Sequence, residues 1–387
     1  MRSLQESPNA IEHLANRGVD IAEIQTNLIT DSDWEEAEWR QPLAALDRSI
    51  RGFYEPVGNW LVEQRVSDRD IEALKTALGA STPHRKLPAE MLASNRWIRR
   101  QGFKLLKAQT HEMWQPAGTR RRWFFITLIT DIGNALEYAP VIEIKRLKTA
   151  FGKILRASGL HSFAVLEFQG GTNFPQGGEG RTIMAHAHAI GFTDDEEFDA
   201  EHLESRLREQ STLHNWLGAP TIKIVPVPSR DQLHRRCSYL FKAPIRGCFL
   251  SKNDWKKSGF EILKTDISPE FSVRLAELLC QLNYSAIVFS TGGGNTIKTP
   301  WLRALRKWHT QRAANHVVDY AAIWRKVWAA SCARTTRQPF DIRYNATLKL
   351  STAWQEAISA YRERVERARE EKKAAKRRPH ASKTTTP

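Results

Sequence analysis

The sequence predicts an α+β protein: a central antiparallel sheet of about five strands with flanking helices, and further helical regions at both ends of the chain. Two observations support this fold class. Between residues 120 and 250, short runs rich in β-branched and aromatic residues alternate with stretches whose apolar residues recur at helical spacing. Outside that segment the helical spacing predominates.

Composition narrows the class of protein. With 387 residues, the chain is long enough for two or three domains. Its 41% hydrophobic and 26% charged residues are typical of a globular protein. The net charge of +15 favours a polyanionic partner, nucleic acid before an anionic membrane surface, although many basic proteins bind no nucleic acid specifically.

Nothing in the sequence predicts a membrane or secreted protein. No apolar run approaches the roughly 18 residues of a transmembrane helix, and the first residues lack the apolar core of a signal peptide. The cysteines have no Cys-x-x-Cys spacing, so we expect free thiols in a reducing cytoplasm. They are Cys237, Cys248, Cys280 and Cys332.

Residues 1–95 are expected to form a helical N-terminal region. Ser67 is placed to cap a helix that Gly79 ends, and the acidic residues at 31–33 precede another helical run. Residues 82–88, which contain two prolines, are expected to be a linker, so a domain boundary is expected near 82–95.

The central segment is predicted to alternate strands and helices. Strands are expected at 123–130, 162–168, 181–192 and 221–227, and helices at 140–157, at 194–217 and from Ser229 to before Pro244. Pro226 favours an edge position for the last strand. A glycine-rich loop joins the second and third strands, so we expect them to pair as a hairpin.

The C-terminal part is predicted to be mainly helical. Ser268-Pro269 and Thr299-Pro300 each have the form of a helix start. Residues 290–299 resemble a phosphate-binding loop but have isoleucine where glycine precedes the lysine, so we expect a flexible turn. Residues 361–378 contain nine basic and four acidic residues on an expected helix, either a solvated face or a phosphate contact, and disorder is expected from Pro379 onward.

His186 and His188 are the first candidate functional residues. A strand alternates its side chains between two faces, so both imidazoles point the same way and can bind one metal ion. Glu167 lies on the expected partner strand and can supply a third ligand, which suits a divalent metal with open positions. The alternatives are a chance pair of histidines and a surface glutamate.

Tyr239 and Lys242 are expected on one face of the short helix. Tyrosine is a poor nucleophile unless something stabilises its phenolate, and a nearby cation does so. A Tyr-x-x-Lys pair alone is more often packing plus a solvated lysine. The arginines near the motifs are assigned to DNA binding, although exposed arginines need no such role: Arg121, Arg122, Arg235 and Arg236.

The order of these motifs is similar to that of the HUH endonuclease superfamily, in particular the rolling-circle replication initiators of plasmids and phages. A strand like 125–130 is followed by His-hydrophobe-His, here His186-Ala187-His188, and by Tyr-x-x-Lys, here Tyr239 to Lys242. The resemblance covers about residues 120–250, a third of the chain.

The resemblance implies an RRM-like core that binds Mg²⁺ or Mn²⁺ through the histidines and an acidic residue. The tyrosine would attack single-stranded DNA at a replication origin, forming a 5′-phosphotyrosine link and freeing a 3′-OH, while the lysine stabilises charge at the phosphate. The loop between Glu167 and His186 is longer than in compact members. Ala243 and Arg246 stand where a second tyrosine is found in some, so a second subunit or another nucleophile would close the circle.

The domains implied are a helical region at 1–95, the HUH endonuclease domain at 96–260, a helical region at 261–360 and a basic, partly disordered tail at 361–387. The flanks are expected to recognise origin DNA or to bring copies of the chain together, and a host helicase is an implied partner. Two alternatives stay open: an HUH transposase or mobilisation relaxase, and a non-catalytic basic DNA-binding protein whose histidine pair is structural.

Overall fold

The structure is a computed structural model. It describes residues 42–64, 66–80, 86–114, 121–137, 140–172, 181–210, 221–244, 246–252, 260–331 and 340–343. All of these belong to the first of two units of the chain, Met1–Ala346, and none to the second, Thr347–Pro387. The helix expected after residues 31–33, the glycine-rich loop at 173–180 and the basic tail lie outside the described residues.

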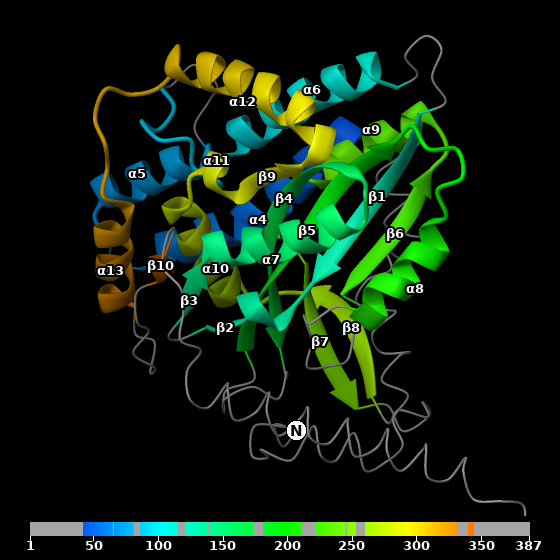
Figure 1. The fold of residues 1–387 in the computed structure, drawn as a ribbon. Coiled ribbons are helices and arrows are strands. Elements are labelled where there is room, and N and C mark those ends of the chain that lie inside the picture. The colour runs from blue at the N-terminus through cyan, green and yellow to red at the C-terminus, as the bar shows by residue number, and fades with distance from the viewer. Residues whose placement is uncertain are drawn as a thin grey trace, which may run out of the picture. The chain divides into compact units, whose positions relative to one another are not determined.

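A long antiparallel hairpin forms the centre of the sheet (Figure 1). Its strands are β4 (His161–Thr172) and β5 (Arg181–Thr193). Next to β5 lies β1 (Arg122–Ile129), and β6 (Ile222–Val227) follows at the edge, both antiparallel to their neighbours. The four predicted strands and the edge position of the proline-containing strand are therefore confirmed.

The sheet is larger than predicted, and it is mixed rather than antiparallel. The strand β7 (Arg246–Lys252) runs parallel to the end of β4 and forms a hairpin with β8 (Phe260–Asp266). Gly247 allows the close approach, because a Cβ there would lie 2.8 Å from the carbonyl oxygen of Gly170. The sheet is thus not purely antiparallel.

Further short strands complete the strand pairing. The strand β9 (Val288–Thr291) pairs with the first half of β4, and β2 (Ala135–Leu136) pairs with β5. A separate parallel pair joins β3 (Val141–Glu143) to β10 (Asp341–Arg343). Because β9 belongs to the region expected to be helical, that region contributes to the sheet.

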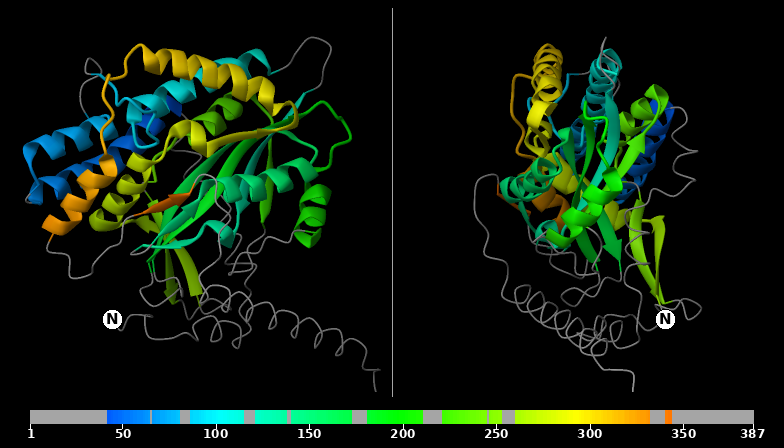
Figure 2. Two further views of the ribbon diagram at one scale, coloured as in Figure 1. Left: turned by 60° about the vertical axis from the view of Figure 1, so that its left-hand side comes forward. Right: turned by 45° about the vertical axis from the view of Figure 1, so that its right-hand side comes forward.

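Helices cover both faces of the sheet (Figure 2). On one face lie α6 (Arg96–Glu112), α9 (Arg230–Tyr239) and α12 (Asn295–Thr310). The ring of Trp301 on α12 contacts Phe163 of β4 at a centroid distance of 5.2 Å. The opposite face is covered by α7 (Ile144–Ala157) and α8 (Ala200–Gln210). This arrangement buries alternate residues of each central strand on opposite sides.

The N-terminal helices α4 (Pro42–Glu63) and α5 (Asp68–Leu78) pack onto the same unit. The Ser67 hydroxyl accepts a hydrogen bond from the backbone of Asp70, and Gly79 ends α5 with φ of +72°, so the predicted cap and stop are both confirmed.

The expected linker at 82–88 is described only from residue 86, and residues 86–95 pack against the rest of the unit. Leu87 bridges to Ala313 and Leu92 bridges to Asn283. Buried apolar side chains at Leu87 and Leu92 explain why this segment packs instead of linking.

Two helix starts also differ from the prediction. The helix α8 begins at Ala200 and not at 194, because the Asp199 carboxylate accepts hydrogen bonds from the first backbone N–H groups of the helix. The helix α12 begins at Asn295, so Thr299 is not an N-cap and Pro300 lies within the helix.

The remaining described helices are α10 (Pro269–Gln281), α11 (Tyr284–Ile287) and α13 (Tyr320–Ala330). The predicted Ser268 cap of α10 is confirmed. The stretch expected to be a flexible turn forms a 3₁₀ helix, Gly292–Gly294, against β4. A Cβ at Gly294 would collide with the backbone of Ser162, so glycine is required there.

Among the described helices, none has the length and apolar character needed to cross a membrane. Cys237, Cys248 and Cys280 are buried free thiols, as expected, and Cys332 lies outside the described residues.

Candidate metal and nucleophile site

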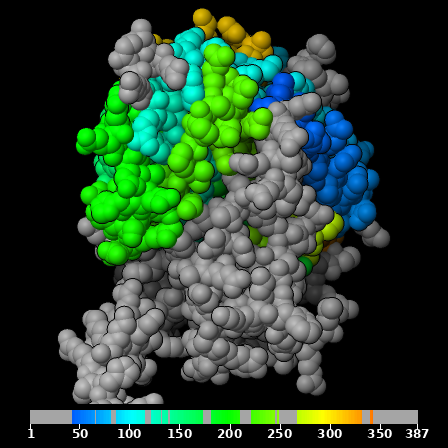
Figure 3. Space-filling model, turned by 90° about the vertical axis from the view of Figure 1, so that its right-hand side faces the viewer, coloured from blue at the N-terminus to red at the C-terminus, as the bar shows by residue number. Residues whose placement is uncertain are grey.

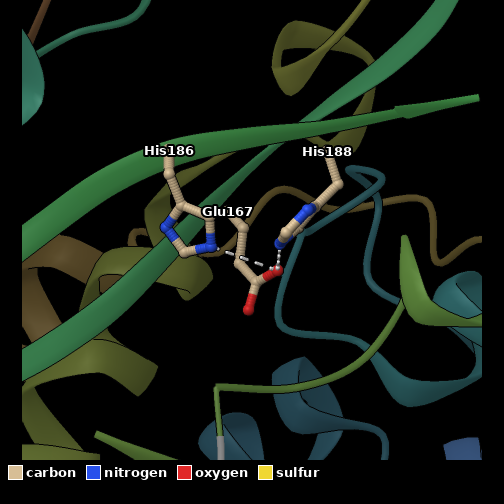
Figure 4. A group of neighbouring side chains, drawn as sticks. All are labelled: Glu167, His186 and His188. Carbon is tan, nitrogen blue, oxygen red and sulfur yellow. Dashed lines mark ion pairs between the residues drawn. The ribbon is translucent and has the colours of Figure 1, made fainter. Parts of the chain in front are cut away.

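The register of the central hairpin brings three predicted metal ligands together. Glu167 of β4 lies opposite His186 of β5, and His188 follows on the same face. The Glu167 Oε2 atom is 3.2 Å from His188 Nε2 and 3.5 Å from His186 Nε2 (Figure 4). One ligand atom from each residue lies within 4.8 Å of the other two. Two imidazoles and one carboxylate are a donor set that suits a divalent metal.

Two residues of the neighbouring strand β1 contact the His188 imidazole. Thr127 lies opposite His188, and its hydroxyl is 3.2 Å from His188 Nδ1. Phe125 stacks on the same imidazole at 5.2 Å. A proton on Nδ1 would be donated to the hydroxyl, which leaves the lone pair of Nε2 facing Glu167. The buried Nε2 atom has no hydrogen-bond partner among the described residues, so it fits a metal ligand.

Burial and local charge determine the protonation of this group. Burial lowers the pKa of His188 to about 4, and the adjacent Glu167 opposes that shift only in part. Burial alone would raise the pKa of the Glu167 carboxyl, but Lys242 and the two imidazoles bring it well below its usual value. A neutral imidazole beside an ionised carboxylate is the form that binds a metal.

The helix α9 brings Tyr239 and Lys242 to the same place. Tyr239 is buried, and its ring lies edge-on to His188 at a centroid distance of 5.0 Å. Lys242 was predicted to lie on this helix, but α9 ends at Tyr239 and Lys242 lies in the turn that follows. Its Nζ atom is nevertheless 3.5 Å from the centroid of the tyrosine ring and 3.4 Å from Glu167 Oε1.

The end of α9 is held by the N-terminal helices. The buried Arg99 guanidinium on α6 donates hydrogen bonds to the carbonyl oxygens of Ala93, Phe241 and Lys242. The backbone N–H of Ala243 donates to the Ser49 hydroxyl on α4. These contacts determine where the turn that carries Lys242 lies.

The predicted DNA-binding arginines divide into two groups. Arg121 and Arg122 lie at the end of β1 far from the metal ligands, on the order of 17 Å by strand rise from Thr127. Arg121 is paired with Asp194 at 2.8 Å, and Arg122 donates to backbone carbonyls at residues 196 and 198. The structure therefore does not bring these two to the site.

Arg235 and Arg236 lie on α9, half-buried. Arg236 stacks over the ring of Phe125 at 4.8 Å, which places its charge close to the residue that contacts His188. The lime atoms of α9 reach the molecular surface beside the blue atoms of α4 (Figure 3). Arg235 and Arg236, unlike Arg121 and Arg122, therefore lie on the helix that carries Tyr239.

Sequence reasoning missed Thr127 and Arg99. A threonine in the apolar strand 123–130, on the same alternation as the histidine pair, is a signal that could have identified the first. No local pattern identifies Arg99, because its acceptors at the end of α9, Phe241 and Lys242, lie more than 100 residues away.

Comparisons with protein-family models, curated proteins and solved structures found no match to this chain. The resemblance to HUH endonucleases therefore stays a prediction from the motifs.

Proposed function

We propose that this chain nicks and rejoins single-stranded DNA through attack by Tyr239, assisted by a divalent metal such as Mg²⁺ or Mn²⁺ at His186, His188 and Glu167. On this proposal the substrate is a replication origin of a plasmid or phage, and the chain initiates rolling-circle replication. The net charge of +15 is compatible with such a polyanionic substrate.

One observation carries the proposal: residues from distant parts of the sequence converge on one point. Glu167 contacts both imidazoles and also Lys242, while Tyr239 contacts both His188 and Lys242. A metal-ligand set next to a tyrosine and a lysine is an arrangement that phosphoryl transfer to a phenol requires.

The proposed step exchanges one phosphoester for another. The Tyr239 oxygen bonds to phosphorus, the bond from phosphorus to the 3′-oxygen breaks, and the phenol proton leaves as the 3′-oxygen gains one. The Lys242 ammonium, close to the tyrosine ring, favours the developing phenolate and the charge on the phosphate. A metal bound by the three ligands would polarise a phosphate oxygen. Rejoining is the reverse reaction with a 3′-OH as nucleophile.

The test is incubation of the protein with labelled single-stranded DNA and Mn²⁺, followed by denaturing electrophoresis and mass spectrometry of the adduct. The expected result is a covalent adduct on Tyr239, absent from Tyr239→Phe although that variant still binds DNA. Tyr320→Phe, a buried tyrosine on α13, is the matched control and keeps the adduct. An adduct retained by Tyr239→Phe would refute the nucleophile.

A non-catalytic DNA-binding protein is the second candidate, and one contact favours it. Lys242 lies 3.4 Å from Glu167, so glutamate, histidines and lysine form a charge network even without a metal. The double variant His186→Ala/His188→Ala distinguishes the two functions. Mn²⁺ affinity that is the same in this variant and the unmodified protein, with no DNA cleavage by either, would favour the non-catalytic protein.

The same chemistry serves an HUH transposase or a mobilisation relaxase, which differ from an initiator in the DNA they nick. Comparison of origin, transposon-end hairpin and transfer-origin strands as substrates separates these three roles.

A further inference from the structure

A groove is lined by residues of α7, of α11 and of β9, which follows α11 directly in the chain. Its volume is about 400 Å³. It opens beside β9, which pairs only with β4 in the described sheet. The residues that line the groove and carry polar groups are Lys145, Lys148, Thr149, Arg156 and Ser290.

The segments that form the groove are basic and contain no acidic residue. Neither residues 144–166 nor residues 278–318 include an aspartate or glutamate, although the chain has 43 of them. The same two segments carry ten basic residues, which are Lys145, Arg146, Lys148, Lys153, Arg156, Lys298, Arg303, Arg306, Lys307 and Arg312. Such an imbalance attracts anions.

The cations at the groove are not neutralised by carboxylates. Among the described residues, no ion pair joins Lys145, Lys148, Arg156 or Lys298 to an acidic side chain. Lys148 is partly buried and donates to the carbonyl oxygen of Ala286. Burial lowers the pKa of Lys148, and the nearby charge of Lys298 lowers it further. A bound anion would relieve that repulsion.

The shape of the groove leaves room beside these cations. The Arg156 guanidinium lies over Gly152, where a Cβ would be 3.4 Å from its nearest nitrogen. Ser290 donates a hydrogen bond to Asn295, the first residue of α12, so the positive end of that helix dipole lies next to the groove. Hydroxyls, cations and a helix start together match the phosphate groups of a polymer.

We propose that this groove binds the phosphodiester backbone of a nucleic-acid strand, through Lys145, Lys148 and Arg156. The contact is sequence-independent, because it involves phosphates and not base edges.

The groove is a contact separate from the metal site. Leu147 of α7 packs near Ala185 of β5, so α7 covers the face of the sheet to which Ala185 points. Side chains alternate along a strand, so His186 and His188 point to the opposite face, as does Glu167, which pairs with His186. The groove would therefore hold DNA that flanks the reacting phosphate. Nucleic-acid binding there does not require that the chain nicks DNA.

The experiment measures binding of a fluorescein-labelled single-stranded oligonucleotide of mixed sequence by anisotropy, with EDTA present, over a series of salt concentrations. The groove variant is Lys145→Glu/Arg156→Glu. The control is Arg69→Glu/Lys75→Glu, which changes the net charge equally at exposed positions on α5, outside the groove. Gly152→Leu fills the groove without changing charge. Circular dichroism verifies that each variant is folded.

The groove variant is expected to bind about tenfold or more weakly than the control, and its slope of log K against log salt should fall by about 1.4, for two lost phosphate contacts. Gly152→Leu should also weaken binding. Equal affinities in the groove and control variants would overturn the proposal. So would inorganic phosphate binding to the groove as tightly as the oligonucleotide does, since the ligand would then be a small anion. Because EDTA prevents metal-dependent nicking, these outcomes do not depend on the role of Tyr239.

Discussion

At the residue scale, the neighbours of His188 determine the orientation and the protonation of its imidazole. Its imidazole is buried between Phe125 and Tyr239, so the neutral form is favoured. The Thr127 hydroxyl at Nδ1 selects the ring nitrogen that is left to face Glu167. The position and the protonation of this candidate ligand thus depend on Thr127, which does not belong to the candidate ligand set.

Thr127→Val is therefore expected to weaken Mn²⁺ binding by about 10- to 100-fold, because valine keeps the shape of threonine but cannot accept the imidazole proton. Isothermal titration calorimetry with Mn²⁺ measures the change. The control is Thr193→Val, at the far end of β5, which should bind Mn²⁺ like the unmodified protein. Equal affinities in both variants would show that the hydroxyl does not orient His188.

His234 makes stability depend on pH. Burial lowers the pKa of His234 to about 4, with Lys107 and the stacked His111 adding to the shift. The unfolded chain binds a proton near pH 6.5 and the folded chain does not, so stability is full above 6.5 and is lost as pH falls toward 4. We expect a loss of about 1–2 kcal/mol from this residue, allowing for solvent near the ring.

The measurement is the free energy of unfolding in urea at pH 7 and at pH 4.5. His234→Gln should lose less stability over that interval than the unmodified protein, because glutamine cannot be protonated. A pH dependence identical in the two proteins would contradict the assignment. His188 has a similar pKa shift, so some acid destabilisation is expected to persist in the variant.

At the scale of elements, the sequence predicted those strands and helix ends that depend on contacts between residues close together in the chain. The strand β5 follows from its alternation, and the ends of α5 follow from Ser67 and Gly79, because each depends on neighbours within a few residues. Thr299-Pro300 also has the form of a helix start, but the 3₁₀ turn at Gly292–Gly294 begins the helix earlier. There the packing against β4 overrides the local preference.

Non-local pairing explains the elements that were missed. The strand β7 pairs with β4 residues 77 positions earlier in the chain, and β9 pairs with β4 residues 123 to 129 positions earlier. No local sequence pattern encodes pairings over such separations. The candidate site likewise combines features that depend on local geometry with features that depend on distant residues. The histidines share a face by strand geometry alone, whereas the Arg99 contacts with the end of α9 could not be predicted.

The contact between α6 and the end of α9 can be tested directly. Arg99→Met should destabilise the protein by about 3 kcal/mol, because it leaves buried carbonyl oxygens at Phe241 and Lys242 without donors. Arg100→Met is the matched control. Among the described residues, Arg100 makes a half-exposed ion pair with Asp47 at 3.4 Å and stacks near Trp97, so a loss below about 1 kcal/mol is expected.

Urea denaturation measures both arginine variants, and Mn²⁺ binding gives a second readout. If Arg99 positions the turn that carries Lys242, the affinity of Arg99→Met for DNA should differ from that of the unmodified protein. Its affinity for Mn²⁺ should be unchanged. A stability loss equal to that of Arg100→Met would mean that the guanidinium does not hold the end of α9.

At the scale of the whole molecule, the flanking regions complete the sheet domain. The helix α4 contacts the end of α9 through Ser49, and β9 extends the sheet beside β4. The segment 86–95 pairs with residues near 283 and 313 and so joins the N-terminal helices to the C-terminal ones. The predicted boundary at 260 falls at the start of β8, within the β7–β8 hairpin.

A fragment of residues 96–260 is therefore expected not to fold by itself. It would expose apolar side chains that other regions bury, such as Phe163 beneath Trp301 and Phe241 beneath Tyr284, and it would cut the β7–β8 hairpin. A fragment Met1–Ala346 keeps all of these contacts and should unfold in one cooperative transition. Thermal unfolding followed by circular dichroism and amide dispersion in NMR spectra compares the two. A sharp transition and dispersed spectrum for 96–260 would show instead that the sheet domain is independent of its flanks, and that the contact of Ser49 on α4 with the end of α9 is dispensable for folding.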